Sequence, residues 1–306
     1  MPENPAPSTQ LATRFGMVAV VGRPNAGKST LINHLIGQKI SIVSEKPQTT
    51  RHRILGIRTS EKGQLVFVDT PGIHRPLFKL NRRMLRTAMT SLEDSDVALL
   101  LVDASEGFGR GDKFVIEAIK TYDRPLLVLL NKIDLIRKSR LLPLMSMYGE
   151  ALPAAEIIPL SALRGDNASL VESRLWELAP EGEPMFPAEQ ITDRSNVFRA
   201  AEIVREKILN HTREELPWAT AVRIDQDEVE GDLWRLYFSI LVEKRSQRAI
   251  VIGKGGSFLK MVGTEAREEI EKVFGRKVYL SLQVEHEERW RDSPRQLALL
   301  ELGDDG

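Results

Sequence analysis

The first half of the chain alternates short apolar runs with longer stretches of mixed polarity. The short runs predict strands at Met17–Val21, Ile54–Arg58, Leu65–Asp69, Val97–Asp103, Leu126–Asn131 and Glu156–Leu160. Most of these runs are apolar at consecutive positions, as expected for strands that helices cover on both faces. The pattern therefore predicts a doubly wound α/β domain over residues 14–180.

The pattern changes at residues 180–187, where the stretch PEGEPMFP places three prolines in eight positions. Because proline cannot continue a helix, we predict a linker over residues 181–193. Beyond it, apolar spacing predicts a helix from Val197, strands at Trp218–Ile224 and Leu236–Val242, a short apolar segment at Ala249–Ile252, a helix from Phe258 to Val273 and a strand at Val278–Val284. Residues 194–290 are thus a smaller α+β domain, with a flexible tail at 1–13 and a loosely held tail at 291–306.

Composition excludes several classes of protein. The 306 residues include 43 Lys plus Arg and 43 Asp plus Glu, so the chain is not a globally basic nucleic-acid binder. The absence of Cys excludes disulfides, thiol nucleophiles and cysteine-ligated zinc. No apolar run reaches the ~20 residues of a membrane span, and residues 1–13 lack the basic start and apolar middle of a signal peptide. We expect a cytoplasmic protein in which any nucleic-acid surface is local.

Residues 22–29, GRPNAGKS, match the phosphate-binding pattern G-x-x-x-x-G-K-[ST] between a predicted strand and a predicted helix. The two glycines let the backbone turn N–H groups toward phosphate oxygens, and the helix N-terminus adds partial positive charge. Lys28 is expected to contact the β- and γ-phosphates and the Ser29 hydroxyl to bind Mg²⁺. The expected phosphate-site residues are Gly22, Asn25, Ala26, Gly27, Lys28, Ser29 and Thr30.

The tetrapeptide NKID at 131–134 ends a predicted strand, at the sheet edge where α/β proteins bind ligands. Guanine presents N–H donors at N1 and N2 that one carboxylate can accept together, whereas adenine presents an acceptor at N1. Asp134 therefore favours guanine. We expect Asn131 to bridge N7 and the neighbouring loops and Lys132 to lie along the purine ring. The turn formed by Ser161, Ala162 and Leu163 is expected to place a backbone N–H on O6.

Two further loops carry candidate groups for the triphosphate. In the turn Asp69, Thr70, Pro71, Gly72, we expect the Asp69 carboxylate to hold Mg²⁺ through a water and the Gly72 N–H to sense the γ-phosphate. The polar loop QTTRH at 48–52 supplies a hydroxyl that closes on Mg²⁺, and we favour Thr50 over Thr49. The order of both loops should depend on the γ-phosphate. Lys28, Thr50 and Gly72 are the expected catalytic residues.

Together, the segments GRPNAGKS, QTTRH, DTPG, NKID and SAL resemble the five G-motifs of the TrmE–Era–EngA branch of translation-factor-class GTPases. The resemblance implies hydrolysis of GTP to GDP with Mg²⁺. It also implies slow intrinsic turnover, because Ile73 stands where Ras-type enzymes carry a catalytic Gln. A K⁺ ion held partly by Asn25 is a hypothesis that rests on the same resemblance. His74 is either a bystander or an alternative group that positions water.

A second glycine motif, Gly-Lys-Gly-Gly at 253–256, stands in the smaller domain between two apolar helical segments. The pattern G-x-x-G lets a sugar–phosphate backbone approach peptide N–H groups, and the element order is similar to that of a type II KH domain. Between Glu243 and Lys260 the chain carries five basic residues and one acidic residue, a local positive charge. The expected RNA-binding residues are Lys244, Arg245, Arg248, Ile252, Gly253, Lys254, Gly255, Gly256 and Lys260, with Ile250 as a second apolar surface.

A GTPase domain followed by one KH domain resembles the Era family of GTPases. The resemblance implies binding to the 3′ end of 16S ribosomal RNA on the 30S subunit, a role in its maturation, a monomeric state and, in some members, peripheral association with the inner membrane. The residues by themselves support a GTPase coupled to single-stranded RNA. Two alternatives stay open: a binding module whose GTPase domain only holds GDP, and an ATP-dependent kinase or transporter subunit, which Asp134 disfavours.

Overall fold

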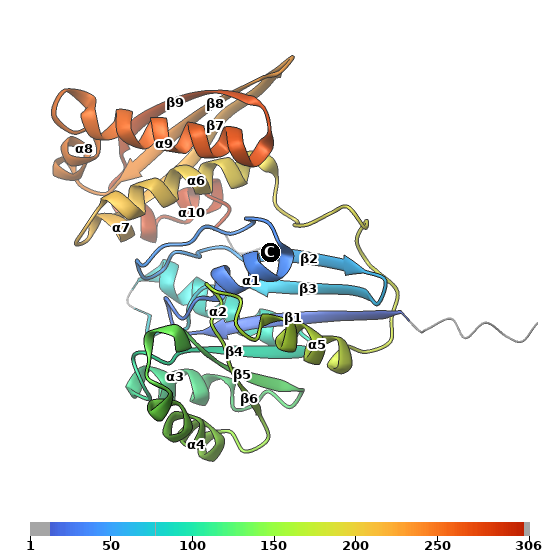
Figure 1. Ribbon diagram of the computed structural model, residues 1–306. Helices are drawn as coiled ribbons and strands as arrows, with labels where there is room; N and C mark the ends of the chain where they lie inside the picture. The colour runs from blue at the N-terminus through green and yellow to red at the C-terminus, as the bar shows by residue number, and fades with distance from the viewer. Residues whose placement is uncertain (1–12, 77, 303–306) are drawn as a thin grey trace, which may run out of the picture.

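Two β-sheets organise residues 13–76 and 78–302, which are the residues that this computed structural model describes (Figure 1). The larger sheet has the strand order β2-β3-β1-β4-β5-β6, and the smaller has the order β7-β8-β9. The flexible tail predicted at 1–13 falls almost entirely on residues 1–12, which lie outside the described residues.

The first domain is the predicted doubly wound α/β fold. Its elements are β1 (Arg14–Gly22), α1 (Lys28–Ile36), β2 (Ile54–Ser60), β3 (Gly63–Asp69), α2 (Lys79–Glu93), β4 (Val97–Asp103), α3 (Arg110–Ile119), β5 (Leu126–Asn131), the short helices η1 (Ile133–Leu135) and η2 (Lys138–Arg140), α4 (Leu141–Ala151), β6 (Glu156–Pro159) and α5 (Ala168–Leu178). β2 runs antiparallel to β3, and the remaining pairs are parallel. The last strand ends at Pro159, one residue before its predicted end.

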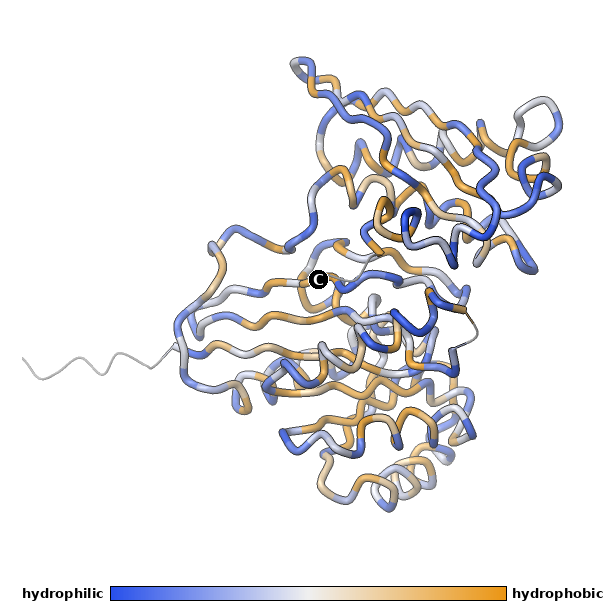
Figure 2. The backbone as a smooth tube through the Cα atoms, turned by 180° about the vertical axis from the view of Figure 1, so that it is seen from behind, coloured by the Kyte–Doolittle hydropathy of each residue, from blue (hydrophilic) through white to orange (hydrophobic). Residues whose placement is uncertain are grey.

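Both faces of the larger sheet are buried, which explains its unbroken apolar strands. Along β1, Val18 and Val20 face the core formed with α1 and α5, while Ala19 and Val21 face the core formed with α2, α3 and α4. Successive side chains of a strand point to opposite faces, so a sheet covered twice needs apolar residues at every position. Figure 2 shows this concentration of apolar residues in the strands and of polar residues in the loops.

The second domain has the predicted order of helix, two strands, two helices and strand, with one additional short helix before the first strand. Its elements are α6 (Asn196–His211), α7 (Leu216–Ala219), β7 (Thr220–Glu230), β8 (Leu233–Val242), α8 (Arg245–Ile252), the turn η3 (Lys254–Gly256), α9 (Ser257–Phe274) and β9 (Lys277–His286). β8 pairs antiparallel with β7 and parallel with β9. Trp218 lies in α7 rather than in the strand predicted for it, and the apolar segment Ala249–Ile252 is the end of a helix.

The prediction of a loosely held C-terminal tail is wrong for residues 291–302. Two short helices, η4 (Trp290–Asp292) and α10 (Pro294–Leu299), follow β9. Leu297 and Leu300, one turn apart, are buried together with Leu80 and Met84 of α2. The apolar face of the segment is therefore covered by α2 of the first domain together with Ala221 and Leu241 of the second, which local sequence did not reveal.

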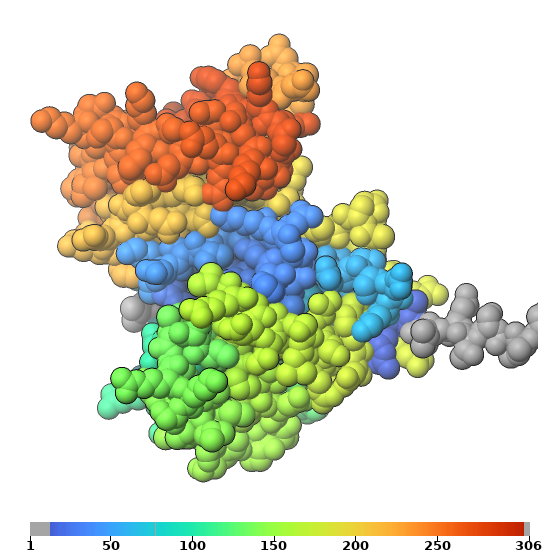
Figure 3. All heavy atoms as spheres, in the orientation of Figure 1, coloured from blue at the N-terminus to red at the C-terminus, as the bar shows by residue number. Residues whose placement is uncertain are grey.

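The linker predicted at 181–193 contains no helix but is held by specific contacts. Gln64 Oε1, on β3, accepts hydrogen bonds from the backbone N–H groups of Met185 and Phe186 at 3.1 and 3.0 Å. Gln64 Nε2 donates to the Phe186 carbonyl. Further on, Gly56 and Thr192 form an isolated β-bridge. The chain then enters α6, which lies over the loop between α1 and β2; in Figure 3 that loop, in blue, fills the space beneath the yellow helix.

Candidate functional site

Two glycines shape the loop that joins β1 to α1. Gly22 has φ 149° and Gly27 has φ 97°, values that side chains rarely allow. A Cβ atom on Gly22 would lie 2.3 Å from the Leu101 carbonyl oxygen, and one on Gly27 would lie 2.2 Å from Asn131 Nδ2. Only glycine fits either position. The other expected phosphate-site residues lie in this loop or on the first turn of α1.

Lys28 is buried inside the loop that it follows. Its Nζ donates to the Arg23 carbonyl at 3.0 Å and to the Gly22 carbonyl at 3.5 Å. Burial lowers the pKa of Lys28 to about 8, an effect that the negative charge of Asp69 partly opposes. The ammonium group is thus held at the centre of the phosphate loop, where it can replace these carbonyl contacts with phosphate oxygens.

Three oxygen-bearing side chains meet beside the phosphate loop. Ser29 Oγ donates to Asp69 Oδ2 at 2.8 Å and lies 2.9 Å from Thr50 Oγ1, which is 3.4 Å from the same carboxylate oxygen. Thr49 Oγ1 instead donates to the Lys46 carbonyl at 2.6 Å. The structure therefore brings Thr50, and not Thr49, to the expected metal ligands.

The donor set at this point fits Mg²⁺. Asp69 Oδ1 is buried and has no hydrogen-bond partner among the described residues, and burial raises the pKa of this carboxyl. Two hydroxyls and a carboxylate are hard oxygen ligands, which Mg²⁺ prefers, and Mg²⁺ keeps several waters while bound by few protein groups. A divalent cation would compensate the buried charge of Asp69. Asn25, the candidate K⁺ ligand, donates from Nδ2 to the Glu45 carbonyl.

Asn131 ties the phosphate loop to the expected base site. Its Nδ2 donates to the Ala26 carbonyl at 2.8 Å, and its Oδ1 accepts from the Ala162 N–H at 2.8 Å. Beside it, Asp134 Oδ1 accepts from Ser161 Oγ at 2.7 Å. The NKID and SAL segments thus converge at the carboxyl ends of neighbouring strands. Leu163, the last residue of the SAL segment, is 79% exposed.

Lys132 has a partner that sequence reasoning missed. Its Nζ lies 2.5 Å from Asp103 Oδ2 at the end of β4. Burial alone would raise the pKa of Asp103, but hydrogen bonds from Lys132 and Ser105 outweigh it and lower that pKa. The ion pair orients the lysine stem. An aspartate that ends an apolar strand next to the NKID strand was the available signal.

The turn that follows β3 packs directly on the phosphate loop. Thr70 Oγ1 donates to the Val20 carbonyl at 2.7 Å, and a Cβ on Gly72 would lie 2.6 Å from the Pro24 nitrogen. The Ile73 N–H donates to the Gly22 carbonyl at 3.0 Å, and the Ile73 side chain is buried in the core. Ile73 therefore offers no side chain that could orient a water.

His74 is a junction between loops. Its Nδ1 lies 2.9 Å from the Gly72 carbonyl oxygen, which only accepts, so the hydrogen is on Nδ1. Nε2 then accepts from Asn81 Nδ2 at 3.0 Å, with Gln48 Nε2 at 3.3 Å. Both ring nitrogens are engaged. His74 links the 48–52 loop to the turn after β3, a contact that local sequence did not indicate.

The glycine tetrad between α8 and α9 has an open backbone. Gly253, Gly255 and Gly256 have φ values of 76°, 61° and 79°. A Cβ on Gly253 would lie 2.6 Å from the Phe258 nitrogen, whereas a Cβ on Gly255 or Gly256 would meet nothing within 4 Å. The last two glycines thus present bare backbone to solvent, flanked by the exposed Lys254 and Lys260.

The other expected RNA-binding residues divide into exposed and packed ones. Lys244, Arg245 and Arg248 are exposed. Arg248 Nε donates to the Val284 carbonyl at 3.1 Å, which tethers this side chain to β9. Ile252 packs partly against the domain core, while Ile250 is 54% exposed. Of the two isoleucines, the exposed one offers the apolar surface.

Comparison with known proteins agrees with both halves of the structure. A family model described as 50S ribosome-binding GTPase matches residues 17–132, and a KH domain model matches residues 215–291. The chain is 47% identical over 286 residues to the GTPase Era of Syntrophus aciditrophicus, which covers 93% of this chain and 94% of that protein. The chain belongs to the Era family of GTPases.

Two solved structures of the Era family share the fold over nearly the whole chain. One is Era in complex with MgGDPNP and nucleotides 1506–1542 of 16S ribosomal RNA; it has a TM-score of 0.91 and 39% identity, and the match covers 95% of this chain and 99% of that one. The other is a variant of Aquifex aeolicus Era bound to GDP·AlF4⁻, with a TM-score of 0.91, 39% identity and coverage of 95% and 100%. The predicted family and the P-loop GTPase plus KH architecture are confirmed.

Proposed function

We propose that this chain hydrolyses GTP to GDP and uses the bound nucleotide to control how its KH domain holds the 3′ end of 16S ribosomal RNA during maturation of the 30S subunit. Its membership of the Era family supports the reaction, and the family structure with MgGDPNP and 16S ribosomal RNA supports the two ligands. The proposed nucleotide and RNA sites are the two sets of residues described above.

The observation that carries the coupling is the attachment of the Thr50 loop to the KH domain. Arg51, which follows Thr50, is buried and donates to the Thr220 carbonyl at 2.8 Å and to the Pro217 carbonyl at 3.0 Å. Trp218 Nε1 donates to the Pro47 carbonyl at 3.2 Å, and Arg205 of α6 donates to the Thr49 carbonyl. Any rearrangement that brings Thr50 onto Mg²⁺ must therefore move, or be opposed by, the KH domain.

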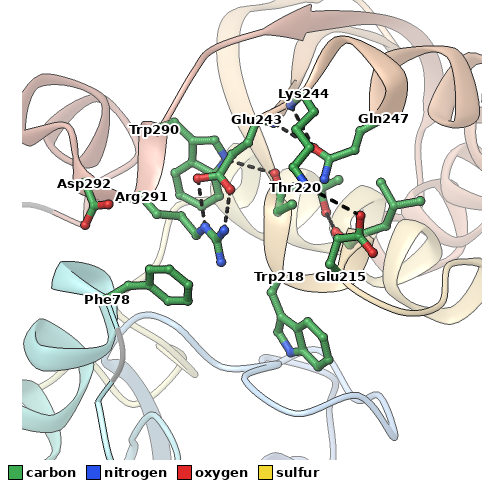
Figure 4. A network of polar contacts seen from close by, with 12 residues as sticks. Phe78, Glu215, Trp218, Thr220, Glu243, Lys244, Gln247, Trp290, Arg291 and Asp292 are labelled. Carbon is green, nitrogen blue, oxygen red and sulfur yellow. Dashed lines mark hydrogen bonds and ion pairs between the residues drawn. The ribbon is translucent and has the colours of Figure 1, made fainter.

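The loop that senses the γ-phosphate reaches the KH domain through a second contact. The Arg291 guanidinium lies 4.2 Å from the centre of the Phe78 ring, just before α2, and pairs with the Glu243 carboxylate (Figure 4). Glu243 joins β8 to α8, and its N–H donates to Gln247 Oε1 at 3.1 Å. Because α8 leads into the glycine tetrad, this chain of contacts connects Phe78, just before α2, to the proposed RNA site.

For the reaction, the chain supplies positioning and charge. Ser29, Thr50 and Asp69 would hold Mg²⁺, which supplies neutralisation of charge on the β- and γ-phosphates. Lys28 binds the same phosphates, and the Gly72 N–H orients the γ-phosphate. Ile73 is buried and apolar and both His74 nitrogens are engaged within the protein, so neither residue takes the place of the Ras-type glutamine. We therefore expect slow intrinsic hydrolysis, and a comparison of rates in KCl and NaCl tests the K⁺ hypothesis at Asn25.

The decisive experiment measures RNA affinity in each nucleotide state. A labelled single strand with the 3′-terminal sequence of 16S ribosomal RNA is titrated against the full chain with GDP and with a non-hydrolysable GTP analogue. We expect two different affinities; equal affinities mean zero coupling free energy and leave the GTPase domain as a platform that only holds nucleotide. The double variant Lys254→Asp with Gly255→Asp should lose RNA binding at an unchanged basal GTPase rate. Lys272→Asp, an exposed cation at the far end of α9, is the matched control.

Among the described residues, no helix combines the length and apolarity that crossing a bilayer requires. We propose that the chain works in the cytoplasm, where its proposed RNA partner is found, with the inner face of the membrane as a second location. Fractionation of cells followed by immunodetection tests both locations.

A further inference from the structure

Ser41 lies in the loop between α1 and β2, in a part of that loop that none of the sequence motifs includes. The residue is only 2% exposed, and its Oγ has no hydrogen-bond partner among the described residues. The same holds for Asp69 Oδ1 at the proposed Mg²⁺ site. Buried polar atoms in proteins are nearly always paired, because an unpaired one is costly. Both atoms therefore require a partner in the working protein.

The Ser41 side chain is a neighbour of the Asp69 carboxylate. Burial raises the pKa of Asp69, and the positive charge of Lys28 is the strongest influence against that rise. Side-chain contacts also lower this pKa, and they come from the hydroxyls of Ser29, Ser41 and Thr50. Ser29 and Thr50 already meet Asp69 Oδ2. Ser41 is thus a further hydroxyl beside the carboxylate that is expected to hold the metal.

Helix α1 fixes the backbone of Ser41. Asn33 Oδ1 accepts from the N–H groups of Ile40 and Ser41 at 2.9 and 3.0 Å, and Asn33 Nδ2 donates to the Ser41 carbonyl at 2.7 Å. Asn33 stands four residues after Ser29 and therefore on the same face of α1. The helix that places Ser29 beside Asp69 thus also holds Ser41 there.

The KH domain holds this loop on both sides of Ser41, where α6 lies over it (Figure 3). Glu206 of α6 is only 4% exposed; its Oε2 lies 2.5 Å from Lys39 Nζ, and its Oε1 accepts from the Val43 N–H at 2.8 Å. Lys39 also pairs with Glu269 of α9, the helix that begins after the glycine tetrad. Because Lys39 and Val43 flank Ser41, a single carboxylate of the KH domain fixes the loop around it.

We infer that Ser41 is a positioning residue of the proposed Mg²⁺ site: its hydroxyl orients the Asp69 carboxylate, and Glu206 of the KH domain fixes the backbone that carries Ser41. The inference rests on the proposed nucleotide site and adds to it a residue from outside the motifs. Groups that contact a metal-binding carboxylate orient it and tune its affinity for the metal. Since Glu206 belongs to the KH domain, the affinity for Mg²⁺ depends on how the two domains are docked.

The test compares GDP binding with and without Mg²⁺ in the full chain. A fluorescent GDP is titrated in excess Mg²⁺ and in excess EDTA, and the ratio of the two affinities reports the contribution of the metal. Ser41→Ala keeps the backbone bonds to Asn33 and should lower this ratio about tenfold, with GDP binding in EDTA unchanged. Ser44→Ala is the matched control, because Ser44 Oγ, in the same loop, donates to Asn210 of α6 at 2.9 Å.

Glu206→Gln tests the contribution of the KH domain. The variant keeps an acceptor for the Val43 N–H but loses the charge that holds Lys39, and it should lower the same ratio about threefold. If Glu206 acts through Ser41, the double variant should lose no more than Ser41→Ala alone. Glu265→Gln is the control, since Glu265 contacts His211 inside the KH domain at 2.8 Å. Circular dichroism verifies that each variant is folded.

The possible outcomes separate this inference from the proposed site. An unchanged ratio in Ser41→Ala, an equal loss of GDP affinity in Mg²⁺ and in EDTA, or the same loss in Ser44→Ala overturns the inference while the proposed metal site stands. Wild-type GDP binding that ignores Mg²⁺ overturns the proposed metal site and this inference with it. Additive losses in the double variant overturn the link from Glu206 to Ser41.

Discussion

The chain contains two glycine loops that precede a helix, and they are built in opposite ways. In the phosphate loop before α1, a Cβ on Gly22 or Gly27 would overlap the Leu101 carbonyl or the Asn131 side chain. In the tetrad before α9, a Cβ on Gly255 or Gly256 would meet only open space. The first loop needs glycine because the protein itself surrounds it. The second needs glycine for its positive φ and for whatever approaches from outside.

The difference matches the two kinds of ligand. A nucleotide is small and has a fixed shape, so its site can be preassembled by contacts such as Asn131 with Ala26 and Ala162, or Asp134 with Ser161. A single RNA strand is long and flexible, and at the proposed RNA site it would meet exposed cations and bare backbone. Preassembly produces selectivity for one base, while an open basic surface produces affinity for phosphates in general.

The largest expected effect comes from removing the lysine side chain of the phosphate loop. Lys28→Ala should reduce GTP binding or hydrolysis by at least about 100-fold, because it removes a charge aimed at the transferred phosphate. Hydrolysis assays and titration with fluorescent nucleotide measure the loss. The KH domain should still bind RNA in the same preparation. If the variant still hydrolysed GTP, Lys28 would not be a phosphate-binding residue.

Selectivity for the base should follow from one carboxylate. Asp134→Asn should weaken GTP by about 10- to 100-fold, the range for loss of charge-assisted hydrogen bonding, and should improve binding of xanthosine nucleotides, whose edge suits an amide. Competition between the two nucleotides for the wild-type and variant chains measures this exchange. Arg164→Gln, which alters a neighbour 3.8 Å from the same carboxylate, is the control. An unchanged preference for guanine would place Asp134 outside the site.

The dependence of binding on salt concentration should also differ between the RNA site and the nucleotide site. If the exposed Lys244, Arg245, Lys254 and Lys260 each neutralise one phosphate of a single strand, raising KCl fourfold should weaken RNA binding about 50-fold through counterion release. GDP binding in its enclosed loop should change by less than about threefold, since buried contacts are screened little. Parallel titrations at several KCl concentrations give both slopes. A flat RNA slope would contradict recognition through phosphates.

The last comparison tests the glycines of the two loops directly. Gly27→Ala should lower the free energy of unfolding by about 3 kcal/mol, because a strained φ is combined with overlap against Asn131. Gly256→Ala should lower it by about 1 kcal/mol, the cost of a left-handed φ alone, and should weaken RNA binding. Urea denaturation followed by circular dichroism measures both. Equal destabilisation would mean that the tetrad is packed as tightly as the phosphate loop.

Much of the nucleotide site could be read from the chain because each motif is short and local. A strand, a glycine turn and a helix follow one another within residues 14–36, so spacing alone predicts that Lys28 and Ser29 start a helix beside phosphate. The choice of Thr50 over Thr49 also agrees with the structure, where only Thr50 meets Ser29. The tetrad could be recognised for the same reason, since both of its flanking helices are adjacent in sequence.

Contacts between segments far apart in sequence could not be read in this way. Arg51 looks like an ordinary arginine of a polar loop, yet it donates hydrogen bonds to the backbone carbonyls of Pro217 and Thr220 in the other domain. The sequence predicted a loosely held C-terminal tail, yet Leu297 and Leu300 are buried against α2. The contacts of His74 with Gly72, Asn81 and Gln48 join three segments, and only the folded structure brings these segments together.

By itself, the sequence determined which segments become strands, helices and glycine turns, and which side chains stand at the ends of strands. Those properties depend on backbone conformation and on the spacing of apolar residues within one segment. Only the tertiary structure decided how the Thr50 loop meets the KH domain and where the C-terminal leucines are buried. The sequence shows that an apolar face or a charged side chain requires a partner, but packing across the whole chain decides which residue that partner is.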